Sequence, residues 1–498
     1  MSVELKQSVN LPTEKMLDQS AHWIMILPAN VPKTLWLRVP YGETIRQFRE
    51  RLHQPENNEA LVQDLPNTMH TRLSHACVTM DISSFKLLGL ARKLVDAHLR
   101  FKPKTLSIMV MGFDGEHTER LTEAVITAAL AAVARLPEFK QKKDKAQPLK
   151  QIRVYGCSRG DGFARTFAAN EGNTLARRLS MLPPNKLEPF HYRKEVEKLA
   201  KAKRWNYEFI GINELKKRKC GAFLAVSQGS ATADAGIIHL RYRPAGKSRE
   251  TLALVGKGIC YDTGGNSLKP PRYMFGMHED MLGSAVALGT FLALSELRVD
   301  FAMDCWLALA MNHIGPKAYK PNDVVTASDG TNIEVVNTDA EGRMVLADTL
   351  VMASKSRPRL IIDYATLTGS CVHALGTAYS GVFSNRNELL SLLIEAGSDS
   401  GERVWPFPLD EDFDEAIKST IADVRQCALE AGPDHIQASR FLQRFVKNDT
   451  PWVHVDLSAM NNKGGLAHIP TDSTGFGVRF SLDLILDKDI LAKVKQSE

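Results

Sequence analysis

The 498-residue sequence lacks several features that would place it in a specialised class of proteins. No apolar run approaches the roughly 18 residues of a membrane-spanning helix. The seven scattered cysteines include no C-x-x-C pair, so neither a thiolate zinc site nor a disulfide framework is indicated. The first ten residues contain no apolar segment typical of a signal peptide. Dispersed thiols and the missing export signal together predict a cytoplasmic protein with no membrane partner.

Basic residues outnumber acidic residues only in the first third of the chain. Residues 1–170 hold 24 Lys and Arg against 17 Asp and Glu, and the chain totals of 63 and 57 leave 39 against 40 for the remainder. A basic region can contact nucleic acid, although a modest excess is more commonly a solvated surface. DNA binding or a regulatory role, with Lys142, Lys143 and Lys145 as contact residues, therefore stays as the alternative to catalysis.

The spacing of apolar residues predicts an α/β protein of two domains. In the first domain, strands are predicted at Trp23–Leu27, Leu35–Val39 and Thr105–Met111, and helices at Phe85–Leu99 and Leu121–Leu136. From Leu252 onward, strands alternate with helices, which is typical of βαβ units. We expect a variable N-terminal domain at residues 1–170 and a C-terminal catalytic domain at 171–498, each a mostly parallel sheet flanked by helices. In such sheets, sites form beyond the carboxyl ends of the strands, where Asp363 and Thr366 are predicted to lie.

A charged motif, Asn-Thr-Asp-Ala-Glu-Gly-Arg, occupies residues 337–343, just before a predicted helix at Met344–Ser354. Asp339 and Glu341 are two positions apart, so both can face one point from a turn or a strand end. Carboxylates that converge in this way repel each other unless they are paired or bind a metal. Taken alone, the motif is also compatible with a solvated acidic turn.

A second charged cluster follows the predicted strand Leu252–Ile259. Its charged side chains are Lys257, Asp262, Lys269 and Asp280. The lysine within the strand either pairs with an acid or, once desolvated beside a metal, loses its proton and coordinates. The four acids of the two clusters would balance two divalent ions, as in two-metal hydrolases whose ions lie about 3.5–4 Å apart. Oxygen ligands with one amine suit zinc, manganese or magnesium.

Other motif interpretations agree less well with the sequence. Asp262-Thr263-Gly264 matches the triplet of aspartic proteases, but that chemistry needs a second carboxylate in an equivalent loop, and no second copy occurs. The H-E-x-x-H motif of many zinc proteases is also absent. A different two-metal hydrolase, such as a phosphoesterase, remains a rival interpretation.

The two clusters resemble the signatures of the leucine aminopeptidase family of dinuclear metallopeptidases. Further similar segments stand in the family's order over about residues 172–490: 255–258, 262–265, 267–269, 280–281, 365–369, 452–456 and 474–478. The resemblance implies an aminopeptidase that releases N-terminal, leucine-like residues from peptides. It also implies a homohexamer. No motif of residues 1–170 matches, and the N-terminal domains of the family vary widely.

The resemblance also assigns roles to individual residues. One ion is assigned to Lys257, Asp262, Asp280 and Glu341, and the other to Asp262, Asp339 and Glu341. The catalytic positions match Lys269 and Arg343, with a bicarbonate on Arg343 as general base. The substrate-binding positions match Met277, Thr366, Leu367 and Gly369. The chain departs from the family at Leu282, Met311 and Asn461, which affects the predicted specificity and rate and leaves every ligand in place.

Overall fold

The computed structural model describes residues 3–52, 57–142, 148–246 and 251–494. Its contacts divide the chain into two compact units. The first consists of Met1–Asn170 with Lys463–Asp472, and the second of Glu171–Asn462 with Ser473–Glu498. The N-terminal boundary between them falls inside helix α6 (Ala164–Ser180). Of the three lysines considered for DNA contact, Lys143 and Lys145 lie outside the described residues.

The first unit is built on a six-stranded sheet. Its strands are β1 (Glu4–Ser8), β2 (His22–Pro28), β3 (Leu61–Asp64), β4 (Arg72–Val78), β5 (Thr105–Val110) and β6 (Gln151–Tyr155), and its helices are α1 (Glu14–Leu17), α2 (Lys33–Trp36), α3 (Gly42–Arg51), α4 (Ser84–Leu99) and α5 (Gly115–Ala132). The strand order is β1-β6-β5-β2-β4-β3, and only β3 pairs antiparallel. Alternate residues of β2 face two separate cores, one of which packs against α4 and α5.

One predicted strand of this unit is wrong. The run Leu35–Val39 contributes to α2 and the turn that follows it. Pro32 precedes the helix in an extended conformation, and its carbonyl oxygen accepts hydrogen bonds from the backbone N–H groups of Leu35 and Trp36. So short an apolar run does not distinguish the period of a helix from that of a strand.

The segment Lys463–Asp472 completes the first unit although it comes late in the chain. Arg92 of α4 donates hydrogen bonds from Nη1 to the Ile469 carbonyl oxygen and from Nη2 to the Gly464 carbonyl oxygen, both at 2.9 Å. Ala467 packs against the core formed with α4 and α5. A division of the chain at residue 170 alone would separate this segment from the helix to which it is bonded.

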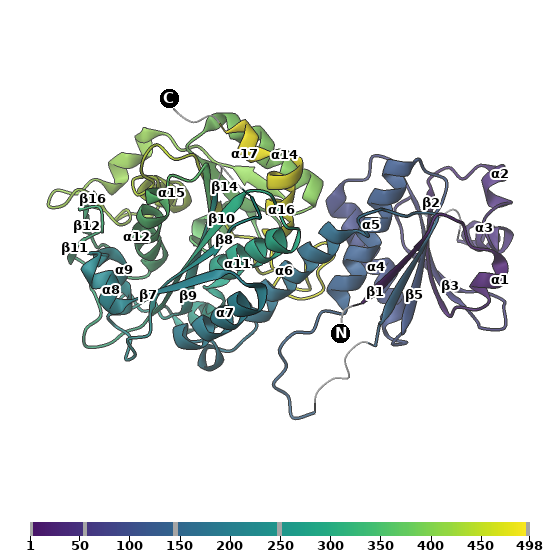
Figure 1. The fold of residues 1–498 in the computed structure, drawn as a ribbon, viewed down its shortest axis with the longest axis horizontal. Helices are drawn as coiled ribbons and strands as arrows, with labels where there is room; N and C mark the ends of the chain where they lie inside the picture. The colour runs from purple at the N-terminus through teal and green to yellow at the C-terminus, as the bar shows by residue number, and fades with distance from the viewer. Residues whose placement is uncertain (1–2, 53–56, 143–147, 247–250, 495–498) are drawn as a thin grey trace. The chain divides into compact units, whose positions relative to one another are not determined.

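The second unit contains an eight-stranded mixed sheet (Figure 1). Its strands, in spatial order, are β15 (Val404–Pro406), β14 (Ser380–Ser384), β17 (Trp452–Asp456), β13 (Leu360–Ala365), β9 (Thr251–Asp262), β10 (Ala302–Asn312), β8 (Gly236–Tyr242) and β7 (Asn206–Gly211). The four central strands, β17-β13-β9-β10, are parallel. A small separate sheet joins β11 (Val324–Thr326), β12 (Asn332–Glu334) and β16 (Val424–Arg425).

Helices cover both faces of the central strands. The helices of the second unit include α7 (Pro189–Lys203), α9 (Gly221–Ser227), α11 (Leu282–Glu296), α12 (Glu341–Lys355), α13 (Gly369–Leu375), α14 (Leu390–Ser400), α15 (Asp434–Gln443) and α16 (Val478–Leu482). Figure 1 shows α12 and α11 on either side of the sheet. Within the described ranges, none of the helices combines the length and apolarity that a membrane crossing requires.

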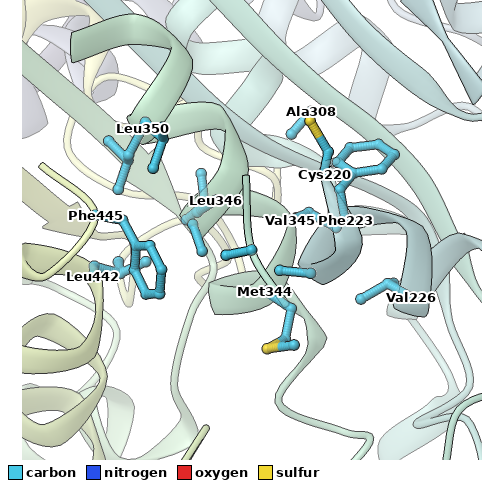
Figure 2. Close-up of a cluster of buried hydrophobic side chains, with 14 of the residues drawn as sticks. Cys220, Phe223, Val226, Ala308, Met344, Val345, Leu346, Leu350, Leu442 and Phe445 are labelled. Atoms are coloured by element: carbon cyan, nitrogen blue, oxygen red, sulfur yellow. The ribbon is translucent and has the colours of Figure 1, made fainter. Parts of the chain in front are cut away.

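The first turns of α12 are held by a dense apolar core. Figure 2 shows Leu346 and Leu350 beside Leu442 and Phe445, and Val345 beside Phe223. Buried side chains of this kind are close-packed, so the helix has little freedom to shift. The rigid helix therefore fixes the position of the charged residues that precede and begin it.

The alternation of side chains along β9 places one lysine beside α12. Val255 belongs to the same core as α12, whereas a Cβ atom added at Gly256 would lie 2.4 Å from the Cα atom of Ser284 in α11. Lys257, the next residue, returns to the α12 face. A Cβ atom at Gly342 would lie 2.6 Å from the Lys257 Cε atom, so the close approach of helix and lysine requires a glycine there.

Candidate metal centre

Three buried carboxylates converge at the carboxyl end of β9. Asp262 is the last residue of that strand, Asp280 follows the short turn η2 (Met277–Glu279), and Glu341 is the first residue of α12. One oxygen atom from each lies within 4.8 Å of the others. All three side chains are buried, so their mutual repulsion is weakly screened and needs compensation.

Lys257 supplies part of this compensation. Its Nζ atom lies 2.8 Å from Asp280 Oδ1 and 2.8 Å from Glu341 Oε1, and it donates a hydrogen bond to the Thr366 carbonyl oxygen. Burial alone would lower the pKa of Lys257, but the carboxylates of Asp280, Glu341 and Asp262 outweigh burial and raise it above its usual value. The ammonium group is therefore the internal counterion of the cluster.

Lys269 connects the fourth acid to the cluster. Its Nζ atom lies 2.9 Å from Asp262 Oδ2 and 2.6 Å from Asp339 Oδ1. Burial and then the charge of Glu341 raise the pKa of Asp262 to about 7, against the opposing effect of Lys269. Burial also raises the pKa of Asp339. The structure thus joins all four predicted acids through two lysines, with Asp339 outside the compact trio.

The loop before α12 is held by polar residues that the sequence did not mark as functional. Thr338 Oγ1 donates to the Gly264 carbonyl oxygen at 2.6 Å, and the Thr338 carbonyl oxygen accepts from Asn312 Nδ2 and the Tyr319 hydroxyl, both at 2.9 Å. Asn312 Nδ2 also donates to Asp262 Oδ1 at 2.7 Å. These bonds fix the two acidic loops relative to each other. They join residues far apart in sequence, so no local pattern indicates them.

The chemistry of the cluster fits divalent metal ions. Its donors are carboxylate oxygens and one lysine nitrogen, which hard and borderline cations accept. The Oδ2 atom of Asp280 is buried, and among the described residues it has no hydrogen-bond partner. An unpaired buried carboxylate oxygen is costly, and a cation would satisfy it.

Arg343 and the predicted substrate residues lie around the same strand ends. Arg343 is buried in the first turn of α12, where its Nη2 atom pairs with Asp434. Thr366 and Leu367 follow β13 and are half-buried, and the first residue of α13, Gly369, is exposed. Their loop is fixed by Asp456, whose carboxylate accepts bonds from the Leu367 N–H and the Thr368 hydroxyl. Met277 is half-buried at the start of η2.

The three residues at which the sequence departs from the family lie in different parts of the second unit. Leu282 is fully buried at the start of α11, and Met311 is buried in β10. Asn461 donates a hydrogen bond to Glu279 Oε2 at 2.9 Å, close in sequence to Asp280. These positions leave the carboxylate trio in place.

Asp363, which the sequence placed at a site-forming strand end, is not part of the cluster. It is fully buried and accepts a hydrogen bond from Trp452 Nε1, and it lies 2.7 Å from His454 Nδ1. Those partners satisfy both of its oxygen atoms. Its position inside β13, two residues before the strand ends, explains the difference.

A buried, lysine-balanced carboxylate cluster at the strand ends of an α/β domain agrees with a metal-dependent hydrolase. The profile of the cytosol aminopeptidase family, catalytic domain, matches residues 174–482. The chain therefore belongs to the cytosol aminopeptidase family and is a metalloaminopeptidase. The predicted family and enzyme class are confirmed.

Relatives in several bacteria support this assignment. A probable cytosol aminopeptidase of Polaromonas naphthalenivorans is 40% identical over 369 residues, which cover 73% of this chain and 71% of the relative. A probable cytosol aminopeptidase of Wolbachia pipientis is 37% identical over 410 residues, which cover 80% of each chain. The similarity thus extends over most of both proteins.

Solved structures share the fold across nearly the whole chain. The bottromycin maturation enzyme BotP in complex with Mn has a TM-score of 0.81 and 28% identity, covering 94% of this chain and 100% of that one. A tomato leucine aminopeptidase mutant has a TM-score of 0.82 and covers 98% and 97%, at 24% identity. The predicted fold class, two α/β parts with the catalytic domain C-terminal, is confirmed.

Proposed function

We propose that the cluster holds two divalent metal ions that serve the release of N-terminal residues from peptides. The convergence of the Asp262, Asp280 and Glu341 oxygens within 4.8 Å carries this proposal. With Lys257, these residues would hold one ion, and Asp262, Asp339 and Glu341 would hold the other. Two such ions supply an acidified water and a polarised carbonyl group to peptide hydrolysis. The manganese in the BotP complex makes manganese a first candidate, with zinc and magnesium as the others.

The surrounding residues would orient the substrate. Lys269 lies between Asp262 and Asp339, and as an ammonium group it can donate to the oxyanion that develops on the scissile carbonyl. Thr366, Leu367 and Gly369 follow β13 beside the cluster, where they can bond to the peptide backbone. If the site binds the free amine of the substrate, cleavage is restricted to the N-terminal residue, because only that residue of a peptide carries a free amine.

Several finer expectations remain predictions. Met277 offers an apolar wall for leucine-like side chains, and one methylene there alters selectivity by about 1–3 kcal/mol. The homohexamer and the cytoplasmic location stay as predicted from the resemblance and the sequence. The bicarbonate predicted on Arg343 has a competitor, because Asp434 already pairs with that guanidinium group. DNA binding gains no support from the comparisons.

The first prediction is that leucine p-nitroanilide and leucyl dipeptides are hydrolysed only by metal-loaded protein. Chelation should abolish hydrolysis, and Mn²⁺, Zn²⁺ or Mg²⁺ should restore it. Leucine p-nitroanilide should be turned over about tenfold or more faster than the glycine analogue, measured as kcat/KM, because its side chain buries apolar area. A panel of phosphoesters is the control for the rival two-metal chemistry. Hydrolysis that survives chelation, or a phosphoester preference, would refute the proposal.

The second prediction is that metal affinity rises with pH. Binding requires the carboxylate form of Asp262, whose pKa is about 7, and the neutral form of Lys257, whose pKa is raised. Protons therefore compete with metal, and the competition from Asp262 strengthens as the pH falls through 7. Apparent affinity should increase by about tenfold per pH unit for each proton released. Calorimetry in buffers of different ionisation enthalpy would count those protons, and a pH-independent affinity would contradict both assignments.

A further inference from the structure

The guanidinium group of Arg343 is already paired with an anion that belongs to the chain itself. Its Nη2 atom lies 2.9 Å from Asp434 Oδ1 and 2.8 Å from Asp434 Oδ2, and its Nη1 atom donates to the Gln426 carbonyl oxygen at 3.1 Å. Only 2% of the Arg343 side chain is exposed, against 39% of the Asp434 side chain. The pair thus joins a fully enclosed cation to a carboxylate that solvent and small solutes can still reach.

The carboxylate of Asp434 is fixed beside the substrate loop. Asp434 is the first residue of α15, and the next residue, His435, donates its backbone N–H to Ser370 Oγ at 2.8 Å. The His435 Nδ1 atom lies 2.9 Å from the same hydroxyl oxygen. Ser370 follows Gly369 in α13, so these bonds anchor the start of α15 to the predicted substrate segment.

An external anion on Arg343 would have to compete with this carboxylate. A guanidinium group binds planar anions through its N–H donors, and here Nη1 and Nη2 are both engaged. These bonds leave the Nε–H and one Nη1–H of the enclosed guanidinium group, so a bicarbonate would have to displace Asp434 or accept from those two remaining donors. The donor set therefore does not fit bicarbonate as well as it fits the chain's own carboxylate.

We propose that Asp434 supplies the anion at Arg343, so that this enzyme works without bicarbonate. This inference rests on the proposed function, because it concerns the same reaction. Arg343 holds the Asp434 carboxylate, which takes the place that the resemblance gives to bicarbonate. A carboxylate can accept a proton as bicarbonate can, so Asp434 in the place of bicarbonate preserves the chemistry that such an anion offers.

The chain provides a matched control for the test. Arg440, which lies on α15 with Asp434, pairs with Asp414 through two nitrogens, with Nε to Oδ1 at 2.8 Å and Nη2 to Oδ2 at 2.7 Å. Asp414→Ala removes a carboxylate from this arginine and from Arg444, whose Nη2 atom lies 3.2 Å from Asp414 Oδ2. It separates the general cost of a broken ion pair from an effect specific to Arg343.

Two readouts on metal-loaded, full-length protein test the proposal. Turnover of leucine p-nitroanilide is measured in buffer purged of carbon dioxide, with and without added bicarbonate or formate. Binding of ¹³C-labelled bicarbonate is followed by NMR line broadening with a diamagnetic metal. We expect the wild type to be unaffected by bicarbonate and to bind none. This arm needs no variant, so it stands even if a substitution impairs folding.

The variants should respond to anions in opposite ways. In Asp434→Ala, kcat should fall by about 10²-fold with little change in KM, and bicarbonate or formate should bind and restore it with saturation. In Asp434→Asn, kcat should fall without rescue, because the amide fills the same space. Asp414→Ala should show no anion response.

Other outcomes would overturn the proposal. If the wild type binds bicarbonate and loses turnover when carbon dioxide is removed from the buffer, bicarbonate displaces Asp434 from Arg343. Wild-type turnover of Asp434→Ala in purged buffer would show that no anion is needed. If no variant hydrolyses peptides with any metal, the proposed function fails, whereas the NMR arm still reports whether removing Asp434 opens an anion site.

Discussion

Replacing Glu341 with glutamine should remove bound metal and reduce peptide hydrolysis by at least about 10³-fold, which corresponds to about 4 kcal/mol of transition-state stabilisation. Glu341 is one of the two acids, with Asp262, that are assigned to both ions, and its Oε1 atom lies 2.8 Å from Lys257 Nζ. The amide keeps the shape of the side chain but loses the negative charge. Two divalent ions would then face too few anionic oxygens in a buried site, where charge is poorly screened.

The test counts metal ions per chain by elemental analysis and measures kcat on leucine p-nitroanilide. Glu334→Gln is the matched control, because Glu334 is also shielded and pairs with Arg425 at 3.1 Å in the small three-stranded sheet. The control should keep both ions and its activity. A Glu341→Gln protein that retains two ions and wild-type turnover would disprove the assignment of this residue as a ligand.

Replacing Lys269 with alanine should have a different signature: metal stays bound while kcat falls by about 10²–10³-fold. The ammonium group lies 2.9 Å from Asp262 Oδ2 and 2.6 Å from Asp339 Oδ1, so it competes with a cation for those oxygens. Burial alone would lower the pKa of Lys269, but the nearby carboxylates of Asp262, Glu341 and Asp339 outweigh it and raise the pKa. The group therefore stays charged and can stabilise an oxyanion. Its removal should tighten metal binding and weaken catalysis.

Lys257→Ala is the comparison that distinguishes the two lysines. Both are lysines within 2.9 Å of two site carboxylates, yet only Lys257 is proposed as a ligand. Metal affinity should fall for Lys257→Ala and rise for Lys269→Ala, as measured by competition with a chromogenic chelator. Equal loss of metal in both variants, or unchanged turnover without Lys269, would contradict the separate roles.

The predictions from sequence were strongest where a short segment carries its own chemistry. Lys257 and Asp262 come from one strand and its end, and Asp339 and Glu341 from one loop, so local pattern indicated that each group would cluster. The parallel order of β13, β9 and β10 then brings those strand ends to a common edge. Asp363 shows the limit of this reasoning, because it lies two residues before the end of β13, where Trp452 and His454 contact its carboxylate.

The features that the sequence did not predict depend on contacts between segments that are far apart in the chain. Asp434 meets Arg343 across 91 positions of sequence, in a region with no recognisable motif. Strand β4 was also missed, because its buried positions include Ser74 and His75 as well as apolar residues. Ser74 donates its hydroxyl hydrogen to the Leu94 carbonyl oxygen at 2.9 Å, a partner that no period in the sequence reveals.

The late segment Lys463–Asp472 has a consequence for the order in which the protein can be built. Residues 1–170 are synthesised first. Arg92 donates hydrogen bonds to the carbonyl oxygens of Gly464 and Ile469, and these residues are made only after nearly the whole chain. Domains commonly fold in sequence order during synthesis. Here the unit that is synthesised first is completed only at Asp472, shortly before Ser473–Glu498 complete the second unit, so a chain that stops before residue 463 would leave both parts unfinished.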